Sequence, residues 1–254
     1  MRDEFNRFLA ALSFFTRLPV PGSHSAEGLD GAARYFPLAG IIVGVLGALA
    51  TWAASFILPL SLAVIAGMAA TIIITGAFHE DGFSDACDGF GGGWKGGDEG
   101  RAQVLAIMKD SRVGSYGALG IALMLLAKWN ALMEIPDEAL IFAIVAAHAI
   151  SRFAATTLMF ALDYVREEGK SKPLAKRMGA GDLAVAGVFG LAPCLLLPTT
   201  ETLVALAATA FATFLCARTF VRRIGGYTGD CLGATQQVAE LAFYAGFLVQ
   251  WNSG

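Results

Sequence analysis

The amino-acid sequence predicts an all-α integral membrane protein with about seven transmembrane helices, and three observations support this fold class. The 254-residue chain is 56% hydrophobic, with a mean hydropathy of +0.61. Only 15% of its residues are charged, whereas soluble domains carry about 25%. Seven windows are apolar over about the 20 residues that a membrane-spanning helix needs. We therefore expect residues 1–254 to form a single polytopic membrane domain.

The seven apolar windows follow one another with short connections. They are residues 35–58, 60–78, 113–133, 139–162, 182–199, 201–220 and 232–251. Pro59 separates the first two windows and Pro198 lies where the fifth and sixth meet, so tight hairpins are expected at both places. Gly40 and Gly44 are spaced so that a neighbouring helix can pack closely against the first window.

Basic residues occur only in alternate connections between the windows, which predicts the orientation. The basic residues of these connections are Arg2, Arg7, Arg17, Arg34, Lys95, Arg101, Lys109, Arg112, Arg166, Lys170, Lys172, Lys176, Arg177, Arg218, Arg222 and Arg223. The connections at residues 59, 134–138 and 200 contain none. Because basic short loops stay in the cytoplasm, we expect a cytoplasmic N-terminus, a periplasmic C-terminus and an odd number of spans.

Residues 1–34 form a cytoplasmic or interfacial segment in this interpretation. Five apolar residues recur at helical spacing on one face: Phe5, Phe8, Leu9, Leu12 and Phe15. Such a helix can lie in the membrane interface. The alternative is an ordinary surface helix docked on the bundle. Pro19 and Pro21 then end the helix.

The segment 79–112 is the most informative part of the chain, and we expect it to be an acidic catalytic loop on the cytoplasmic side. It contains seven acidic residues. Asp81, Asp85 and Asp88 are spaced i, i+4, i+7, which puts the three carboxylates on one face if the stretch is helical. Their mutual repulsion requires a cation, and carboxylate oxygens suit Mg²⁺. Gly82 and Gly89 would let the backbone approach a bulky anion.

Further polar residues flank the later windows. Lys109, Asp110, Ser111 and Arg112 precede the third window, and an arginine there suits phosphate oxygens. Asp230 lies just before the last window, at an expected helix N-terminus, where helix capping is the alternative to metal binding. Glu240 lies inside that window, so it is a functional candidate. His148 and Arg152, in the fourth window, either pair with an acid such as Glu240 or contact a ligand.

Composition excludes some functions and leaves others open. A net charge of −3 gives no basic field for nucleic acid. The four cysteines form no CxxC pair and are interpreted as small apolar residues or free thiols. An ion-coupled transporter remains an alternative, although most of the acids lie in one loop and not near the bilayer midplane. Metal-bound carboxylates beside a bilayer favour phosphoryl transfer, with a carboxylate removing a proton from the attacking hydroxyl.

At this point the motifs resemble a known family. Residues His79 to Gly89 match the pattern HxDGxxDxxDG of cobalamin synthases, the adenosylcobinamide-GDP ribazoletransferases. Four further blocks, in the same order, are also similar to family segments: residues 15–21, 34–38, 107–114 and 226–234. The sequence Asp85-x-x-Asp88-Gly89 is also similar to the CDP-alcohol phosphotransferases, so a phospholipid synthase is an alternative, but the second half of their signature is missing.

The resemblance implies that adenosylcobinamide-GDP reacts with α-ribazole, or its 5′-phosphate, to give adenosylcobalamin or its phosphate, and GMP. It implies a Mg²⁺-dependent, multi-pass enzyme of the bacterial inner membrane, either homo-oligomeric or complexed with other cobalamin-assembly enzymes. Its catalytic residues would be His79, Asp81, Asp85, Asp88 and Asp110. Its substrate-binding residues would be Arg17, Gly89, Lys109, Ser111, Arg112 and Arg152. Its metal ligands would be Asp81, Asp85, Asp88, Asp230 and Glu240.

Overall fold

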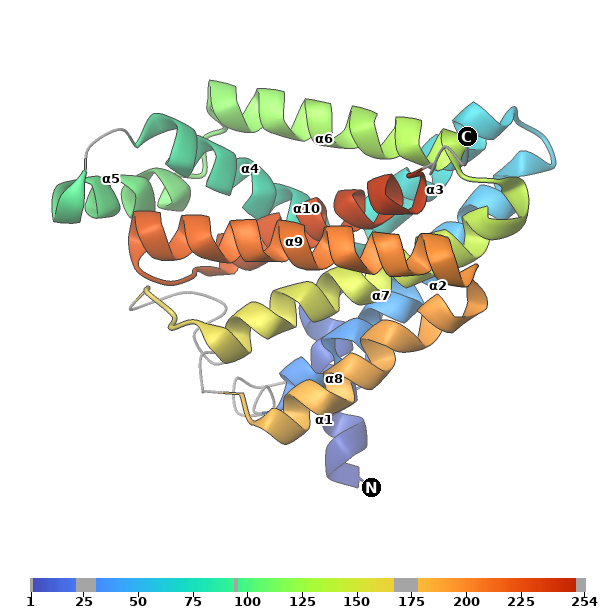
Figure 1. Ribbon diagram of the computed structural model, residues 1–254, viewed down its shortest axis with the longest axis horizontal. Coiled ribbons are helices and arrows are strands. Elements are labelled where there is room, and N and C mark those ends of the chain that lie inside the picture. The colour runs from blue at the N-terminus through green and yellow to red at the C-terminus, as the bar shows by residue number, and fades with distance from the viewer. Residues whose placement is uncertain (1, 22–30, 94–95, 167–177, 250–254) are drawn as a thin grey trace.

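The structure, a computed structural model, describes residues 2–21, 31–93, 96–166 and 178–249, and these are helical with no strand (Figure 1). The helices are α1 Arg2–Phe15, η2 Ala32–Tyr35, α2 Phe36–Ser55, α3 Leu60–Thr75, α4 Phe78–Gly92, α5 Gly97–Lys109, α6 Ser115–Glu134, α7 Asp137–Ala161, α8 Ala180–Leu191, η4 Ala192–Leu196, α9 Thr199–Ile224 and α10 Gly229–Phe247. The all-α prediction is therefore confirmed. Five of the predicted cytoplasmic basic residues lie outside the described residues: Lys95, Lys170, Lys172, Lys176 and Arg177.

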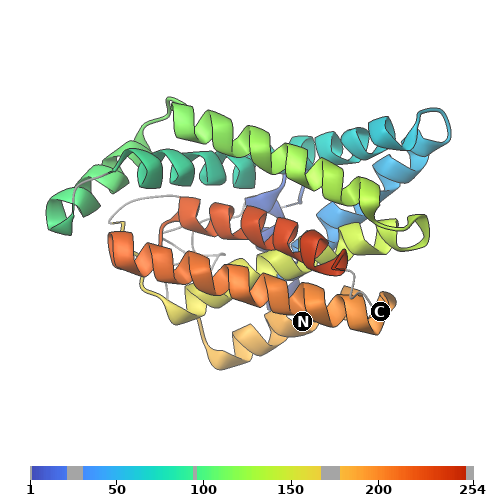
Figure 2. The ribbon, with the colours of Figure 1, turned by 45° about the horizontal axis from the view of Figure 1, so that its top comes forward.

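Two helices, α7 and α10, form the centre of the bundle. Helix α7 packs against α2, α8 and α10, and α10 packs against α4, α6, α7 and α9. Figures 1 and 2 show α6 and α9 along the outside of this centre, with α5 beside one end of α9. A Cβ atom built on Gly44 would lie only 2.9 Å from Cα of Val145. The predicted close packing at Gly44 is thus confirmed, because only glycine lets α2 approach α7 so closely.

Each of the seven predicted windows contains a helix, but the helices differ in their ability to cross a bilayer. Four are long and apolar enough within the described residues: η2–α2, α6, α7 and α9. Helices α3 and α4 meet at 88° and would make a fifth span if counted as one broken span. Helix α3 has 16 residues, about 24 Å of rise, which falls short of a hydrocarbon core of about 30 Å. Seven spans and the sides of the termini remain predictions.

Residues 79–112, the predicted acidic connection between two spans, are helical over most of their length. This segment folds largely as two helices, α4 and α5. Helix α4 begins after Gly76 and Ala77, both in the left-handed conformation with φ of 66° and 58°, which turn the chain out of α3. The acidic residues of α4 therefore have fixed positions on a helix that packs against α10 and α6.

The N-terminal helix α1 docks on the bundle through its second half. Phe15 is buried, and its ring lies 4.4 Å from that of Phe36 and 5.2 Å from that of His79. Phe5, at the other end, is 59% exposed. The second half of α1 is therefore docked on the bundle, as the alternative in the sequence analysis predicted. An interfacial position for its exposed first half remains a prediction.

Candidate active site

Three carboxylates from two helices come together beside the crossing of α4 and α10. Asp81 and Asp85 are on α4, and Asp230 is in the first turn of α10. The charge of Asp81 acts on both Asp85 and Asp230, and the charge of Asp230 also acts on Asp85. A Cβ atom on Gly82 would lie 3.1 Å from Cα of Asp230, so the glycine allows the two backbones to cross at short range. We call Asp81, Asp85 and Asp230 the acidic group.

Electrostatics within the acidic group disfavour three negative charges. Burial, followed by the charges of Asp230 and Asp81, raises the pKa of Asp85 to about 7. Burial also raises the pKa of Asp230, despite the neighbouring Arg166. Both residues lie outside the four apolar helices long enough to span a membrane. A cation placed among these oxygens would favour their ionised forms, so the acidic group is suited to binding one.

Arg166 supplies one positive charge to the acidic group. Its Nη2 atom lies 2.7 Å from Oδ2 of Asp230. A short parallel β-bridge holds the chain after α7 beside the start of α10. The amide of Val165 donates to the carbonyl oxygen of Tyr227 at 3.0 Å, and the amide of Tyr227 donates to the carbonyl oxygen of Asp163 at 2.9 Å. The sequence analysis interpreted Arg166 only as a cytoplasmic loop residue and missed this contact.

Asp88 has backbone partners at the start of α6, and its predicted roles as metal ligand and catalytic residue remain predictions. Its carboxylate is buried and accepts hydrogen bonds from the backbone amides of Gly114, at 2.7 Å, and Gly117, at 2.9 Å. Asp88 thus satisfies unpaired amides at the N-terminus of α6. Gly89, predicted to contact substrate, is buried, and a Cβ atom there would meet the side chain of Met108 on α5. These two residues join α4 to its neighbours.

The segment between α5 and α6 lies at the surface. Lys109, Ser111 and Arg112 are exposed. Asp110 accepts two bonds from Nε of Arg112, at 3.0 and 3.1 Å, and one from its Nη2 at 2.6 Å. The Arg112 guanidinium lowers the pKa of Asp110 to about 2. Within the described residues, no hydrogen bond or ion pair joins them to the acidic group, so their catalytic and substrate-binding roles remain predictions.

His79, Arg152 and Arg17 also lie apart from the three carboxylates. His79 is buried with its ring stacked on Phe15. It is two residues from Asp81 on one helix, which places the two side chains on nearly opposite faces. Arg152 is buried and donates to the carbonyl of His148 at 2.9 Å. The Arg17 side chain is exposed and passes over Gly76.

Glu240 belongs to a buried polar network, and its role as a metal ligand remains a prediction. Its Oε2 atom lies 2.8 Å from Nζ of Lys128 and accepts a bond from Nε2 of Gln236 at 2.8 Å. Its Oε1 atom lies 3.9 Å from Nε2 of His148. The predicted pairing of His148 with Glu240 is therefore seen, but the main partner is Lys128, which the sequence analysis missed.

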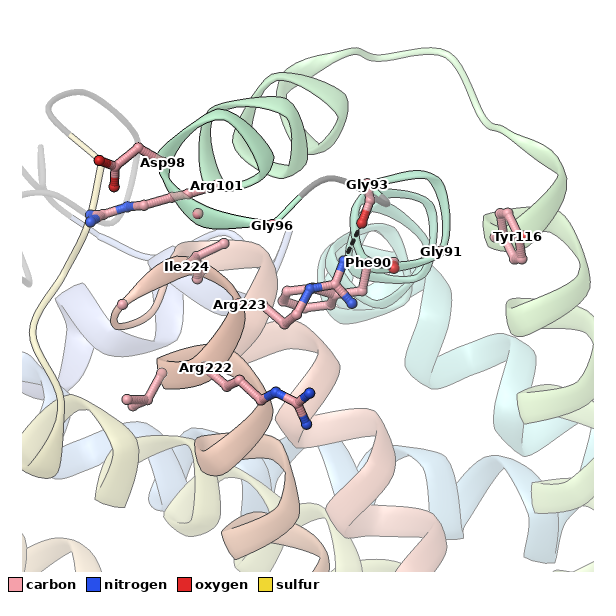
Figure 3. Close-up of a pocket in the computed structure, with 13 residues that line it drawn as sticks. Phe90, Gly91, Gly93, Gly96, Asp98, Arg101, Tyr116, Arg222, Arg223 and Ile224 are labelled. Atoms are coloured by element: carbon pink, nitrogen blue, oxygen red, sulfur yellow. Dashed lines mark hydrogen bonds between the residues drawn. The ribbon is translucent and has the colours of Figure 1, made fainter.

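A large pocket opens where α4 and α9 end and α5 begins. Its volume is about 730 Å³. The lining includes Arg101, Arg222 and Arg223. In Figure 3 the Arg223 side chain points to the end of α4, whereas the side chains of Arg101 and Arg222 point to different sides of the end of α9. Nη2 of Arg223 donates to the carbonyl of Phe90 at 3.1 Å and to that of Gly93. We call this site the arginine pocket. The sequence analysis had treated its arginines only as cytoplasmic anchors.

The acidic group suits a metal that needs few protein ligands. Within the described residues there is no group of three or more His, Cys, Asp or Glu side chains arranged to hold a metal ion by themselves. Mg²⁺ commonly keeps several waters and binds one or two carboxylates together with substrate phosphates. Carboxylates that repel one another beside a single arginine fit that kind of ion.

Comparisons with known proteins agree with the resemblance seen in the motifs. A model of the cobalamin-5-phosphate synthase family matches residues 7–248. A protein of Ralstonia nicotianae is 46% identical over 100% of this chain and 98% of its own length. A protein of Ralstonia pickettii is 44% identical over 100% of this chain and 99% of its own length. A protein of Shewanella frigidimarina is 43% identical over 95% of this chain and 93% of its own length.

All three relatives are named adenosylcobinamide-GDP ribazoletransferase. No solved structure matches the chain. The family model covers nearly the whole chain, including both helices that carry the acidic group. The chain therefore belongs to the cobalamin-5-phosphate synthase family.

Proposed function

We propose that this chain joins adenosylcobinamide-GDP to α-ribazole, or to α-ribazole 5′-phosphate, and releases GMP. The observation that carries the proposal is 46% identity over the whole chain to a protein named for this transfer. The acidic group supports it, because carboxylates beside an arginine suit a reaction between phosphorylated substrates.

Asp81, Asp85 and Asp230 are the residues that would hold Mg²⁺ together with the diphosphate of the corrinoid substrate. Their oxygen atoms are the ligands that Mg²⁺ prefers. Burial, followed by the negative charges of Asp230 and Asp81, raises the pKa of Asp85. When bound, the ion would neutralise the diphosphate and stabilise the charge that develops on GMP. We assign no part in this role to Asp88 or Glu240, because Asp88 binds the amides of α6 and Glu240 pairs with Lys128.

The acidic group would also handle the proton of the reaction. The ribazole hydroxyl attacks the phosphorus on the cobinamide side, a new P–O bond forms, and the P–O bond to GMP breaks. Asp81 is exposed, whereas Asp85 and Asp230 are partly buried. A hydroxyl from solution therefore reaches Asp81 most readily, and we assign proton acceptance to it. Arg166 would orient Asp230 and contact a phosphate oxygen.

The reaction would take place at the cytoplasmic face of the bacterial inner membrane. In the proposed orientation the N-terminus is cytoplasmic and the C-terminus periplasmic. Support comes from the basic residues of alternate connections. Four apolar helices long enough to cross a bilayer support a multi-pass protein.

The proposal is tested by incubating the purified protein with GDP-cobinamide, α-ribazole and Mg²⁺ and measuring GMP. We expect stoichiometric GMP and cobalamin, loss of both with a chelator, and recovery with added Mg²⁺. Competition by guanosine but not cytidine nucleotides separates the transfer from CDP-alcohol chemistry. No GMP from properly folded protein, or undiminished turnover in the chelator, would overturn the function or the metal requirement respectively.

A further inference from the structure

A hydrogen bond outside the acidic group joins the same two helices, α4 and α10. Nε2 of Gln237 on α10 donates to Oε1 of Glu80 on α4 at 3.0 Å. Glu80 directly precedes Asp81, and its Oε2 atom is buried without a hydrogen-bond partner among the described residues. The bond from Gln237 therefore fixes the position of this carboxylate. Neither side chain takes part in the proposed reaction.

The Gln237 amide is held in one orientation. The residue is buried, with 1% of its surface exposed. Its Oε1 atom accepts a bond from Nζ of Lys128 on α6 at 2.7 Å, and its Nε2 atom also donates to Oε1 of Gln236 at 2.8 Å. A lysine ammonium can only donate, so the amide oxygen must face Lys128 and the NH2 group must face Glu80. Gln237 is thus a rigid donor for the Glu80 carboxylate.

The two helices touch through glycines, so side chains do not lock them together at their closest point. A Cβ atom on Gly82 would lie 3.1 Å from Cα of Asp230 and 3.4 Å from Cα of Gly233. A Cβ atom on Gly233 would lie 3.1 Å from the carbonyl oxygen of His79. Because glycine brings backbone against backbone without interlocking side chains, the angle between α4 and α10 depends on bonds made beyond this contact.

The bond between Glu80 and Gln237 lies on one side of the glycine contact, and Asp85 and Asp230 lie on the other. Along α4, Glu80 comes before the contact glycine and Asp85 after it. Along α10, Asp230 comes before the contact glycine and Gln237 after it. The like charges of Asp85 and Asp230 repel each other. The hydrogen bond at the other end of the contact opposes the rotation of α4 that would separate them.

We propose that Glu80 and Gln237 are positioning residues, whose hydrogen bond sets the separation of the carboxylates on α4 and α10 and thereby the affinity of the acidic group for a divalent cation. This inference rests on the metal role in the proposed function. Removing a group that holds metal ligands in place, without touching the metal, weakens affinity by about 10- to 100-fold. The rival explanation is that the charge of Glu80 itself attracts the cation.

Two substitutions of Glu80 separate the bond from the charge. Glu80→Gln keeps an oxygen acceptor at the same reach and removes the charge, whereas Glu80→Asp keeps the charge on a shorter side chain that does not reach Gln237. The probe is Mn²⁺ alone, titrated into detergent-solubilised protein and followed by the EPR signal of the free ion. Binding that Asp85→Asn abolishes is the binding to compare. We expect Kd to stay within about twofold of wild type in Glu80→Gln and to rise about tenfold in Glu80→Asp.

The partner side chain gives a second, independent test. Gln237→Met should also raise Kd for Mn²⁺ about tenfold, and E80D/Q237M should bind no more weakly than either single variant, because all three lose the same bond. Ser151→Ala is the matched control. It removes from α7 the hydroxyl that accepts a bond from Nε2 of Gln236 at 3.0 Å, and it leaves α4 unchanged. It should lower the melting temperature and leave Kd within about twofold of wild type.

Weaker binding in Glu80→Gln with normal binding in Glu80→Asp would show that the charge acts and would overturn the inference. Equal weakening in Ser151→Ala would assign the effect to a general loss of packing. Asp85-dependent binding of Mn²⁺ that is the same in every protein, or missing from the wild type, would overturn the inference as well. Failure of the wild type to release GMP from GDP-cobinamide, with the expected order of Mn²⁺ affinities, would count against the proposed function alone.

Discussion

Arg166 and Asp230 form an ion pair, with Nη2 of the arginine 2.7 Å from Oδ2 of the aspartate, although the two residues are 64 positions apart in the sequence. Neither residue belongs to the HxDGxxDxxDG motif. The pair lies at the junction of the chain that leaves α7 and the first turn of α10. The charges of both residues act on Asp85 of the motif helix α4. The pair therefore links α4 to the segment after α7 and to the start of α10.

Replacing Arg166 with alanine is expected to lower kcat about tenfold, because Asp230 loses the group that orients it. The concentration of Mg²⁺ that gives half-maximal activity should fall, since the carboxylate no longer shares its charge with a guanidinium. Arg166→Lys should retain part of the activity. Arg7→Ala, which breaks a pair with Glu4 on α1, is the control and should stay within about twofold of wild type. A higher magnesium requirement in Arg166→Ala would contradict the assignment.

Asp85→Asn should lower kcat about 100-fold or more, because it removes a metal-binding charge from the centre of the acidic group. The variant should still insert into membranes and should still melt cooperatively. GMP release measures the effect, and Asp137→Asn, an exposed acid in the first turn of α7, serves as control. Wild-type activity in Asp85→Asn would refute the metal-binding role.

Asp88→Ala should reduce stability more than it changes the chemistry. Two amides at the start of α6 would lose a buried carboxylate acceptor, which costs about 2–4 kcal/mol. The melting temperature in detergent should fall clearly, while the residual active protein keeps the wild-type dependence on Mg²⁺. Glu138→Ala, an exposed acid on α7, is the comparison. A normal melting temperature combined with a raised magnesium requirement would return Asp88 to the metal site.

Lys128 and Glu240 should behave as a coupled pair. Lys128→Met leaves the Glu240 carboxylate buried without its cation, and such a loss costs about 3–5 kcal/mol. The double variant K128M/E240Q removes both charges and should recover most of the lost stability. Thermal unfolding of the two single variants and the double variant measures the coupling. Additive losses across the three proteins would show that the pair is not coupled.

The motif spacing predicted part of the candidate site. Asp81, Asp85 and Asp88 do lie on one helix, but Asp88 is about 10 Å further along the axis than Asp81. Over that distance the neighbour of α4 that a side chain meets changes from α10 to α6. Asp81 and Asp85 therefore share the acidic group with Asp230, and Asp88 binds the amides of α6. Helical spacing identifies a common face but not the partner that each part of that face contacts.

The helices, the acidic motif and the family resemblance could be predicted from the sequence, because apolar runs and short motifs are local properties of the chain. Which charges meet depends on the tertiary structure. It brought Asp230 and Arg166 to Asp85, placed Lys128 against Glu240, and gathered the arginines of α5 and α9 into one pocket. The physical reason is that such contacts depend on how closely helices cross, as the glycine at position 82 permits. That distance follows from packing over the whole bundle and not from any one segment.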